Sequence, residues 1–318
     1  MNIAGLDKAC QVTLQTCLGL KPKESLLIVT DDQAPAEIGQ ALFEEARKLG
    51  VEVMWLQMVA RQLDGQELPA AVAQALLQVD AFLGPTSKSF SHTNSRRAAS
   101  KAGVRGATLP GVTLDLFIRL MQSDYHTIAR QAKQLVELIN QQQQAHLTSS
   151  NGTDLQLELK YQFEPDDGIL QAPGSFGNLP AGEVMGAPSN ASGVVVFDTM
   201  GEIITQPTRL VIEQNQVVEI EDNPSGKRLQ QLLDQAVQLD GNRNAYQLAE
   251  LGIGLNPLAQ VSGNVLEDEK VLGTCHLAVG DNSSYPGGTN VCSIHMDGII
   301  LKPSLTIGST LVLDDGQL

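Results

Sequence analysis

The sequence has 318 residues, of which 42% are hydrophobic and 4% aromatic, and 36 acidic against 21 basic residues give a formal charge of −15. This charge repels phosphate backbones and anionic membranes, so we expect neither nucleic acid nor a membrane as a partner. The length exceeds what one hydrophobic core usually serves, and two domains are therefore expected.

The cysteines and the amino-terminal segment predict a cytoplasmic protein. The four cysteines contain no C-x-x-C pair, and a chain of this length needs no disulfide staples, which indicates a reducing compartment. Asp7 and Lys8 interrupt the first 20 residues, so these residues lack the pattern of a signal peptide. No stretch approaches the ~20 apolar residues that a bilayer span requires.

The first half of the chain alternates strand-like and helix-like segments. Apolar runs predict strands over 25–31, 51–58, 80–85 and 106–112, and helical spacing predicts helices over 35–50, 67–78 and 113–145, the last one long or broken. This alternation predicts a parallel sheet with flanking helices. The turn-rich segment 146–154 indicates a linker or a first hairpin, so we predict an α/β domain over residues 1–147.

The second half has a different character. Residues 153–163 and 208–222 alternate polar and apolar side chains with period two, which is typical of strands with one solvated face. A helix is predicted over 226–238, and short strands with glycine-rich turns follow it. We therefore predict an α+β domain over residues 148–318, with a mixed or antiparallel β-rich architecture.

The run "SIHMDGII" (293–300) places two polar side chains in an apolar segment. His295 and Asp297 are two residues apart, so on a strand both side chains leave the same face, as two ligands of one metal would. His276 lies in another strand-like run, "TCHLAVG", and reaches the pair if the two strands are neighbours. Mutual hydrogen bonds within a core would explain the same pattern, so the residues alone leave both interpretations open.

Two carboxylates lie in segments where surface acids are not expected. Glu183 lies among prolines, glycines and apolar residues in "NLPAGEVMGAP", and "YQLAELGIGLNP" predicts Glu250 at the end of a short helical stretch before a glycine-rich turn. Their surroundings do not distinguish metal ligands from ordinary turn residues.

Four segments together resemble the metallo-aminopeptidases of the aminopeptidase T and aminopeptidase S type. These segments, "NLPAGEV", "AELGIGLNP", "EKVLGTCHLAVGDN" and "IHMD", occur in the family's order within residues 178–300, in a chain shorter than the longer family members. The resemblance implies a two-metal exopeptidase with an active-site tyrosine, Tyr285, and the metal ligands Glu183, Glu250, His276, His295 and Asp297. It also implies a homodimer that acts on peptides with a free amino terminus.

The implied site suits hydrolysis. Two divalent cations ~3.5–4 Å apart can activate a shared water, with Glu250 as the bridging carboxylate. Glu183 is either a ligand, which the family favours, or the base that takes the proton of the water. Tyr285 would donate to the oxyanion of the intermediate. Oxygen and imidazole ligands suit Zn, Co, Mn or Mg.

Two alternatives stay open. His276 with the His295 and Asp297 pair is also the facial triad of non-haem iron(II) oxygenases, and ring-cleaving dihydroxypyridine dioxygenases are similar to the same aminopeptidase family. A mononuclear iron site needs only three protein ligands, so the presence of both Glu183 and Glu250 favours the dinuclear hydrolase. The second alternative is a non-catalytic homologue that binds metal or peptides. The sequence thus predicts a metallo-aminopeptidase, with a dioxygenase as the alternative enzyme.

Overall fold

The computed structural model describes residues 3–318, which form two compact units. The first unit comprises the chain up to Ala129 together with Asp166–Ala181, and the second comprises Arg130–Pro165 and Gly182–Leu318. Both units are therefore discontinuous in sequence, and the predicted division into residues 1–147 and 148–318 stays a prediction. Within residues 3–318, no helix combines the length and the apolar character that crossing a membrane requires.

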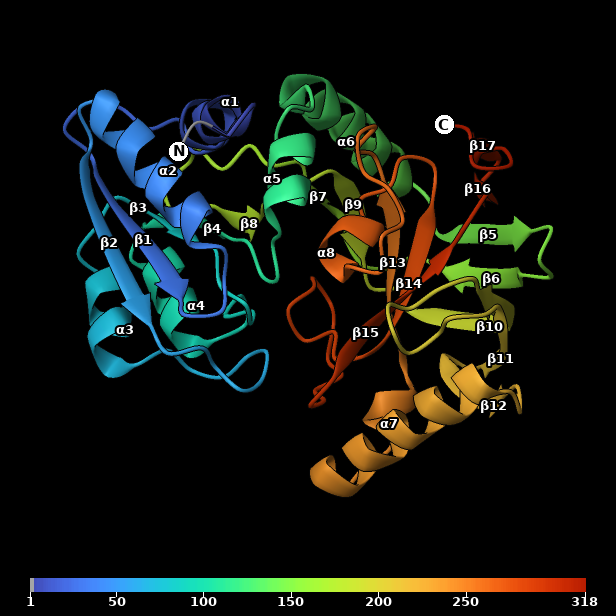
Figure 1. Cartoon of the computed structure of the whole chain (residues 1–318). Coiled ribbons are helices and arrows are strands. Elements are labelled where there is room, and N and C mark those ends of the chain that lie inside the picture. Colours follow the sequence, from blue (N-terminus) through green and yellow to red (C-terminus); the bar gives the residue numbers. More distant parts are fainter. Residues whose placement is uncertain (1–2) are drawn as a thin grey trace. The chain divides into compact units, whose positions relative to one another are not determined.

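The first unit is built on a five-stranded parallel sheet (Figure 1). Its strands, in spatial order, are β2 (Glu52–Met58), β1 (Ser25–Asp31), β3 (Ala81–Gly84), β4 (Arg105–Thr108) and β8 (Phe176–Asn178). Strands β3 and β4 are buried throughout, which explains why their sequences do not alternate. Strand β8 was not predicted, because it returns from the second half of the chain to pair with β4.

Helices cover both faces of this sheet. Leu27 and Val29 of β1 belong to one apolar cluster with Val72 of α3 (Ala70–Leu76) and Ala99 of α4 (Asn94–Lys101). The next side chain along β1, Thr30, points to the opposite face, where it lies against Gly39 of α2 (Ala36–Lys48). The remaining helical segments of this part are α1 (Leu6–Gln11), η1 (Val12–Cys17) and α5 (Leu114–Leu120). The prediction of flanking helices is confirmed.

The long helix predicted over 113–145 is interrupted. Helix α5 ends at Leu120, α6 spans Tyr125–Ile139, and strand β5 begins at Gln144. The break is local in origin, because the carboxylate of Asp124 accepts hydrogen bonds from the main-chain N–H groups of His126 and Thr127 and so starts a new helix.

The second unit contains two antiparallel sheets. The seven-stranded sheet has the order β12 (Gln216–Ile220), β11 (Thr208–Glu213), β10 (Asn190–Phe197), β6 (Asp154–Glu158), β5 (Gln144–Ser149), β16 (Pro303–Ile307) and β17 (Thr310–Leu313). The five-stranded sheet has the order β15 (His295–Ile300), β14 (Cys275–Gly280), β13 (Leu248–Gly254), β9 (Glu183–Gly186) and β7 (Glu164–Asp166). Helices α7 (Pro224–Asp240), η2 (Asn244–Tyr246) and α8 (Val265–Asp268) also belong to this unit, as does α6 from Arg130 onward.

Residues at its two ends determine where α7, the long helix of this unit, begins and ends. The side chain of Asn223 accepts a hydrogen bond from the main chain of Gly226 at the start of α7, and Gly241 ends the helix with a φ of 71°, which favours glycine. The coarse fold prediction is therefore confirmed: one parallel sheet with helices, followed by antiparallel β-rich structure.

Candidate metal centre

The five predicted metal ligands lie on one face of the five-stranded sheet of the second unit. Glu183 begins β9, Glu250 lies on β13, His276 lies on β14, and His295 and Asp297 lie on β15. The ladder pairs Glu250 with Ala278 and Ala278 with Asp297, whereas Gly254 pairs with Glu183, Gly252 with His276 and Gly280 with His295. Residues that face each other across an antiparallel ladder share a face, as do residues two apart on a strand.

Each polar side chain in this ladder has a small partner on a neighbouring strand, although His276 also pairs with Ile299 of β15 on its other side. His276 faces Gly252, and Glu183 faces Gly254. Glu250 and Asp297 both face Ala278, and His295 faces Gly280. Each bulky polar side chain therefore has space above a residue that has little or no side chain of its own.

The predicted helical position of Glu250 is wrong. All seven residues of β13 are buried, and a central strand buried on both faces gives a continuous apolar sequence without alternation. The pairing with β14 shifts register between Leu248 and Glu250, which is a β-bulge. Bulges re-aim side chains locally, and here the bulge precedes the residue that enters the site.

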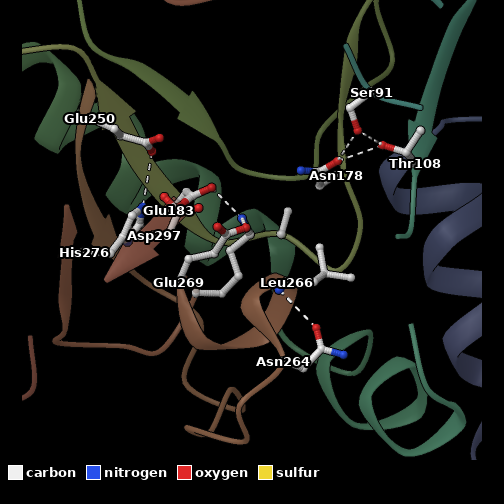
Figure 2. A network of polar contacts seen from close by, with 12 residues as sticks. Ser91, Thr108, Asn178, Glu183, Glu250, Asn264, Leu266, Glu269, His276 and Asp297 are labelled. Atoms are coloured by element: carbon white, nitrogen blue, oxygen red, sulfur yellow. Dashed lines mark hydrogen bonds and ion pairs between the residues drawn. The ribbon is translucent and has the colours of Figure 1, made fainter. Parts of the chain in front are cut away.

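The imidazole and carboxylate groups lie within contact distance of one another. Nε2 of His276 lies 3.2 Å from Oε2 of Glu183 and 3.3 Å from Oε1 of Glu250. Nε2 of His295 lies 3.0 Å from Oε2 of Glu250 and 3.3 Å from Oδ1 of Asp297. Figure 2 shows Glu183, Glu250, His276 and Asp297 converging from neighbouring strands. The structure thus brings together every residue predicted as a metal ligand.

A main-chain hydrogen bond orients His295. Its Nδ1 lies 2.7 Å from the carbonyl oxygen of Asp281, and a carbonyl only accepts, so Nδ1 carries a proton and donates. In the neutral ring, Nε2 then presents its lone pair toward Glu250 and Asp297. An imidazole that ligates a metal through one nitrogen commonly donates from the other in this way.

Tyr285, predicted as the active-site tyrosine, lies beside the cluster. Its hydroxyl donates a hydrogen bond to Oε2 of Glu250, and its ring centroid lies 6.1 Å from that of His295. Burial, and then the negative charge of Glu250, raise the pKa of Tyr285 well above its ordinary value. The phenol is therefore protonated near neutral pH.

Two residues at the site were missed by the sequence analysis. Lys270 is completely buried, and its Nζ donates to Oε1 of Glu183 and, at 2.6 Å, to Oε1 of Glu269. Both residues open the segment "EKVLGTCHLAVGDN", in which only His276 was noted. The signal in the sequence was a charged pair shortly before an apolar strand, since a lysine that becomes fully buried almost always has a charged partner.

The cluster is rich in negative charge. Burial alone would lower the pKa of His276, but the carboxylates of Glu183 and Glu250 raise it well above its ordinary value. Burial would raise the pKa of Glu250, but His276 and His295 hold it well below its usual range. Burial raises the pKa of Glu269 to about 8 although Lys270 opposes that shift. A site of this kind stabilises a bound cation.

The donor set fits a divalent metal ion. Among residues 3–318, the buried atoms Oε2 of Glu183, Nδ1 of His276 and Oδ1 of Asp297 lack a hydrogen-bond partner, and unsatisfied buried carboxylate oxygens are costly. Two groups have ligand atoms within 4.8 Å of one another: Glu183 with Glu269 and His276, and Glu250 with His276 and Asp297. Imidazole and carboxylate ligands suit first-row metals, iron included. These groups identify a place for a metal and leave the predicted number of two ions as a prediction.

Comparisons with known proteins give the family. The family model described as 2,5-dihydroxypyridine 5,6-dioxygenase (NicX) matches residues 5–318. The structure of 2,5-dihydroxypyridine dioxygenase from Pseudomonas putida KT2440 is similar with a TM-score of 0.83 at 17% identity, over 100% of this chain and 98% of that chain. Wild-type AmpT from Thermus thermophilus is similar with a TM-score of 0.71 at 16% identity, over 98% of each chain. Among curated protein sequences, none matches this chain.

The predicted metallo-aminopeptidase, a hydrolase that takes peptides with a free amino terminus, is therefore wrong. The resemblance to aminopeptidase T holds for the fold, since AmpT is similar along the whole chain. The presence of Glu183 and Glu250 does not identify a hydrolase, since Lys270 and Tyr285 donate hydrogen bonds to these two carboxylates in a chain that the dioxygenase family model matches. Because the family model spans residues 5–318, the chain belongs to the 2,5-dihydroxypyridine 5,6-dioxygenase family.

Proposed function

We propose that this protein is a metal-dependent dioxygenase that opens the ring of a dihydroxypyridine. One observation carries the proposal: a buried cluster of imidazole and carboxylate side chains on β13, β14 and β15, in a chain that the dioxygenase family model matches over residues 5–318. Addition of both atoms of O₂ to the two carbons of the cleaved bond balances the reaction without an external reductant.

The proposed metal ligands are His276, His295 and Asp297. They form the set of two histidines and one carboxylate that holds iron(II) and leaves coordination positions open for substrates. The orientation of His295 through Asp281 and the unsatisfied Oδ1 of Asp297 support this assignment. Bound iron(II) would supply the oxygen chemistry that the protein's own side chains cannot perform.

Glu250 and Tyr285 surround these ligands and hold protons in defined places. Glu250 stays ionised because the neighbouring imidazoles of His276 and His295 lower its pKa, and its Oε2 accepts the hydrogen bond from Tyr285. Tyr285 keeps its proton and can donate it as a hydrogen bond to an oxygen of the substrate ring. Glu183, predicted as a ligand or a base, has the role of a partner for Lys270 in this proposal. The homodimer and the cytoplasmic location stay predictions.

Oxygen uptake tests the proposal directly. The protein is first loaded with iron(II) under anaerobic conditions. When O₂ is then admitted, the protein should consume one O₂ for each molecule of 2,5-dihydroxypyridine whose ring absorbance is lost. With ¹⁸O₂, two labelled oxygen atoms should appear in the product. Asp297→Asn should abolish turnover, whereas Asp154→Asn, a matched change at an exposed side chain of β6, should leave it intact. Iron-loaded protein that consumes no O₂ with this ring or its isomers would refute the proposal.

A further inference from the structure

A buried ammonium group lies inside the carboxylate cluster. Lys270 follows α8, and its main chain is fixed on both sides, since its N–H donates to the carbonyl of Glu267 at 2.9 Å and its carbonyl accepts from Asn256 at 2.8 Å. Its side chain has no exposed area, and Nζ contacts Glu183 and Glu269. This main-chain anchoring, together with the two carboxylates, fixes the position of the charge.

The same two carboxylates belong to one of the two groups that could hold a metal. That group is Glu183, Glu269 and His276, so Lys270 binds two of its three ligands. The other group, Glu250 with His276 and Asp297, differs: among residues 3–318, the ion pairs of Glu250 and Asp297 are with histidines. The ammonium group of Lys270 thus lies at one of the two groups, whereas the contacts of the other group are with the imidazoles that would bind the metal.

We infer that Lys270 limits the site to one metal ion, because its ammonium group occupies the position between Glu183 and Glu269 that a second divalent cation would take. A divalent ion bound by these carboxylates would lie within a few ångströms of Nζ, and the repulsion between the two positive charges in a buried site is large. The two groups also share His276, so a second ion would compete for the same imidazole.

This inference rests on the proposed function for the identity of the metal, but it concerns the number of ions rather than turnover. It accounts for a chain that carries all five ligands implied by a two-metal peptidase and yet belongs to a dioxygenase family. Lys270, which binds no metal itself, would thus determine the number of metal ions in the centre.

Metal counting with Mn²⁺ tests the inference. Wild-type protein, dialysed against Mn²⁺ and measured by native mass spectrometry and metal analysis, should hold one ion per chain. Lys270→Met removes the charge at similar length and should bind two ions, whose proximity should broaden the six-line electron paramagnetic resonance signal. Lys270→Arg should stay at one ion, because it restores the charge. The double variant Lys270→Met with Glu269→Gln should also stay at one, because the second position then lacks a carboxylate ligand.

A second measurement does not depend on the folding of the Lys270 variants, since it uses changes of equal size in a chain that keeps Lys270. Asp297→Asn should weaken Mn²⁺ binding by more than about 100-fold, because it removes a direct ligand. Glu183→Gln should weaken it by about 10-fold, the lower end of the loss expected for a residue that contacts a ligand without being one.

Four results would overturn the inference: two Mn²⁺ ions in the wild type, no Mn²⁺ in the wild type, one ion in a folded Lys270→Met variant, or equal losses of affinity for Glu183→Gln and Asp297→Asn. If the wild type binds one ion and its iron-loaded form consumes no O₂ with dihydroxypyridines, the proposed function fails and the role of Lys270 stands.

Discussion

A Cβ atom added to Gly252 would lie 1.9 Å from Nε2 of His276. The two residues pair across β13 and β14, and the imidazole lies directly over the glycine. The absence of a side chain at residue 252 is therefore a structural requirement of the proposed metal ligand.

Gly252→Ala should displace His276 and weaken metal binding by about 100-fold, the upper end of the loss caused by changing residues that hold ligands in place. Gly298→Ala is the matched control, because its added Cβ would lie 2.3 Å from the ring of Phe197 and Gly298 points to the other face of the sheet. It should lower thermal stability and leave the affinity for Mn²⁺ unchanged. Titration calorimetry measures both affinities, and unchanged binding in Gly252→Ala would contradict the placement of His276.

Tyr285→Phe should lower kcat by about 10²- to 10³-fold, the loss typical for one hydrogen-bond donor at a reacting oxygen. Metal content should not change, because the phenol is not among the proposed ligands. Initial rates of ring opening and metal analysis on the same sample provide the test. Tyr246→Phe, which removes a hydroxyl that donates to Asp234 at 2.7 Å, should leave kcat unaltered. A normal kcat in Tyr285→Phe would show that this hydroxyl has no role in the reaction.

Chelation of the metal should lower the melting temperature by several degrees. A ligand present at 100 times its Kd stabilises the folded state by about 2.7 kcal/mol, and this contribution disappears when the ligand is removed. Differential scanning calorimetry with and without EDTA measures the shift. Asp297→Asn, which lacks one of the three proposed ligands, should show a much smaller shift. Equal melting temperatures of wild-type protein in both conditions would argue against a metal in the folded protein.

The first unit should lose stability in acid through Glu24. Partial burial would raise the pKa of Glu24, but hydrogen bonds from Arg105 and from the main chain of Lys21 lower it below its ordinary value. A carboxylate with a lowered pKa stabilises the folded state above its unfolded pKa of ~4.3, and this stabilisation is lost as the pH falls through the folded value.

Glu24→Gln should therefore cost about 1–3 kcal/mol of unfolding free energy at pH 7 and progressively less below pH ~4. Urea unfolding followed by the fluorescence of Trp55, the one tryptophan of the chain, reports on this unit. Glu52→Gln, at an exposed residue of β2, provides the control and should show no such pH dependence. A cost that is equal at pH 7 and pH 3 would contradict the assignment.

Short-range patterns predicted the fold well where neighbouring residues determine structure. The run 25–31 coincides with β1, and the period of two placed His295 and Asp297 on one face of β15. Strand β8 was beyond such patterns, because its three residues become a strand only by pairing with β4, about 70 residues earlier in the chain. Glu250 was missed as a strand residue for a related reason, since β13 is buried between two partners.

The side chains that meet in this cluster were predicted from the sequence, whereas the reaction was not. Carboxylates and imidazoles serve hydrolases and oxygenases alike, so their presence does not identify the chemistry. The distinguishing contacts, Lys270 with Glu183 and Tyr285 with Glu250, join residues 87 and 35 positions apart. Only the folded chain shows that these side chains are in contact.

The five side chains implied for a two-metal peptidase are present in this chain, which belongs to a dioxygenase family. If Lys270 fills one of two cation positions, the residue that distinguishes a one-ion site from a two-ion site is not a metal ligand. A positively charged residue at the position of Lys270 would indicate a site for one metal ion, and a neutral residue there would indicate a site that can bind two. A single substitution outside the ligand set would then be a step by which peptidases and ring-opening oxygenases could diverge from a shared scaffold.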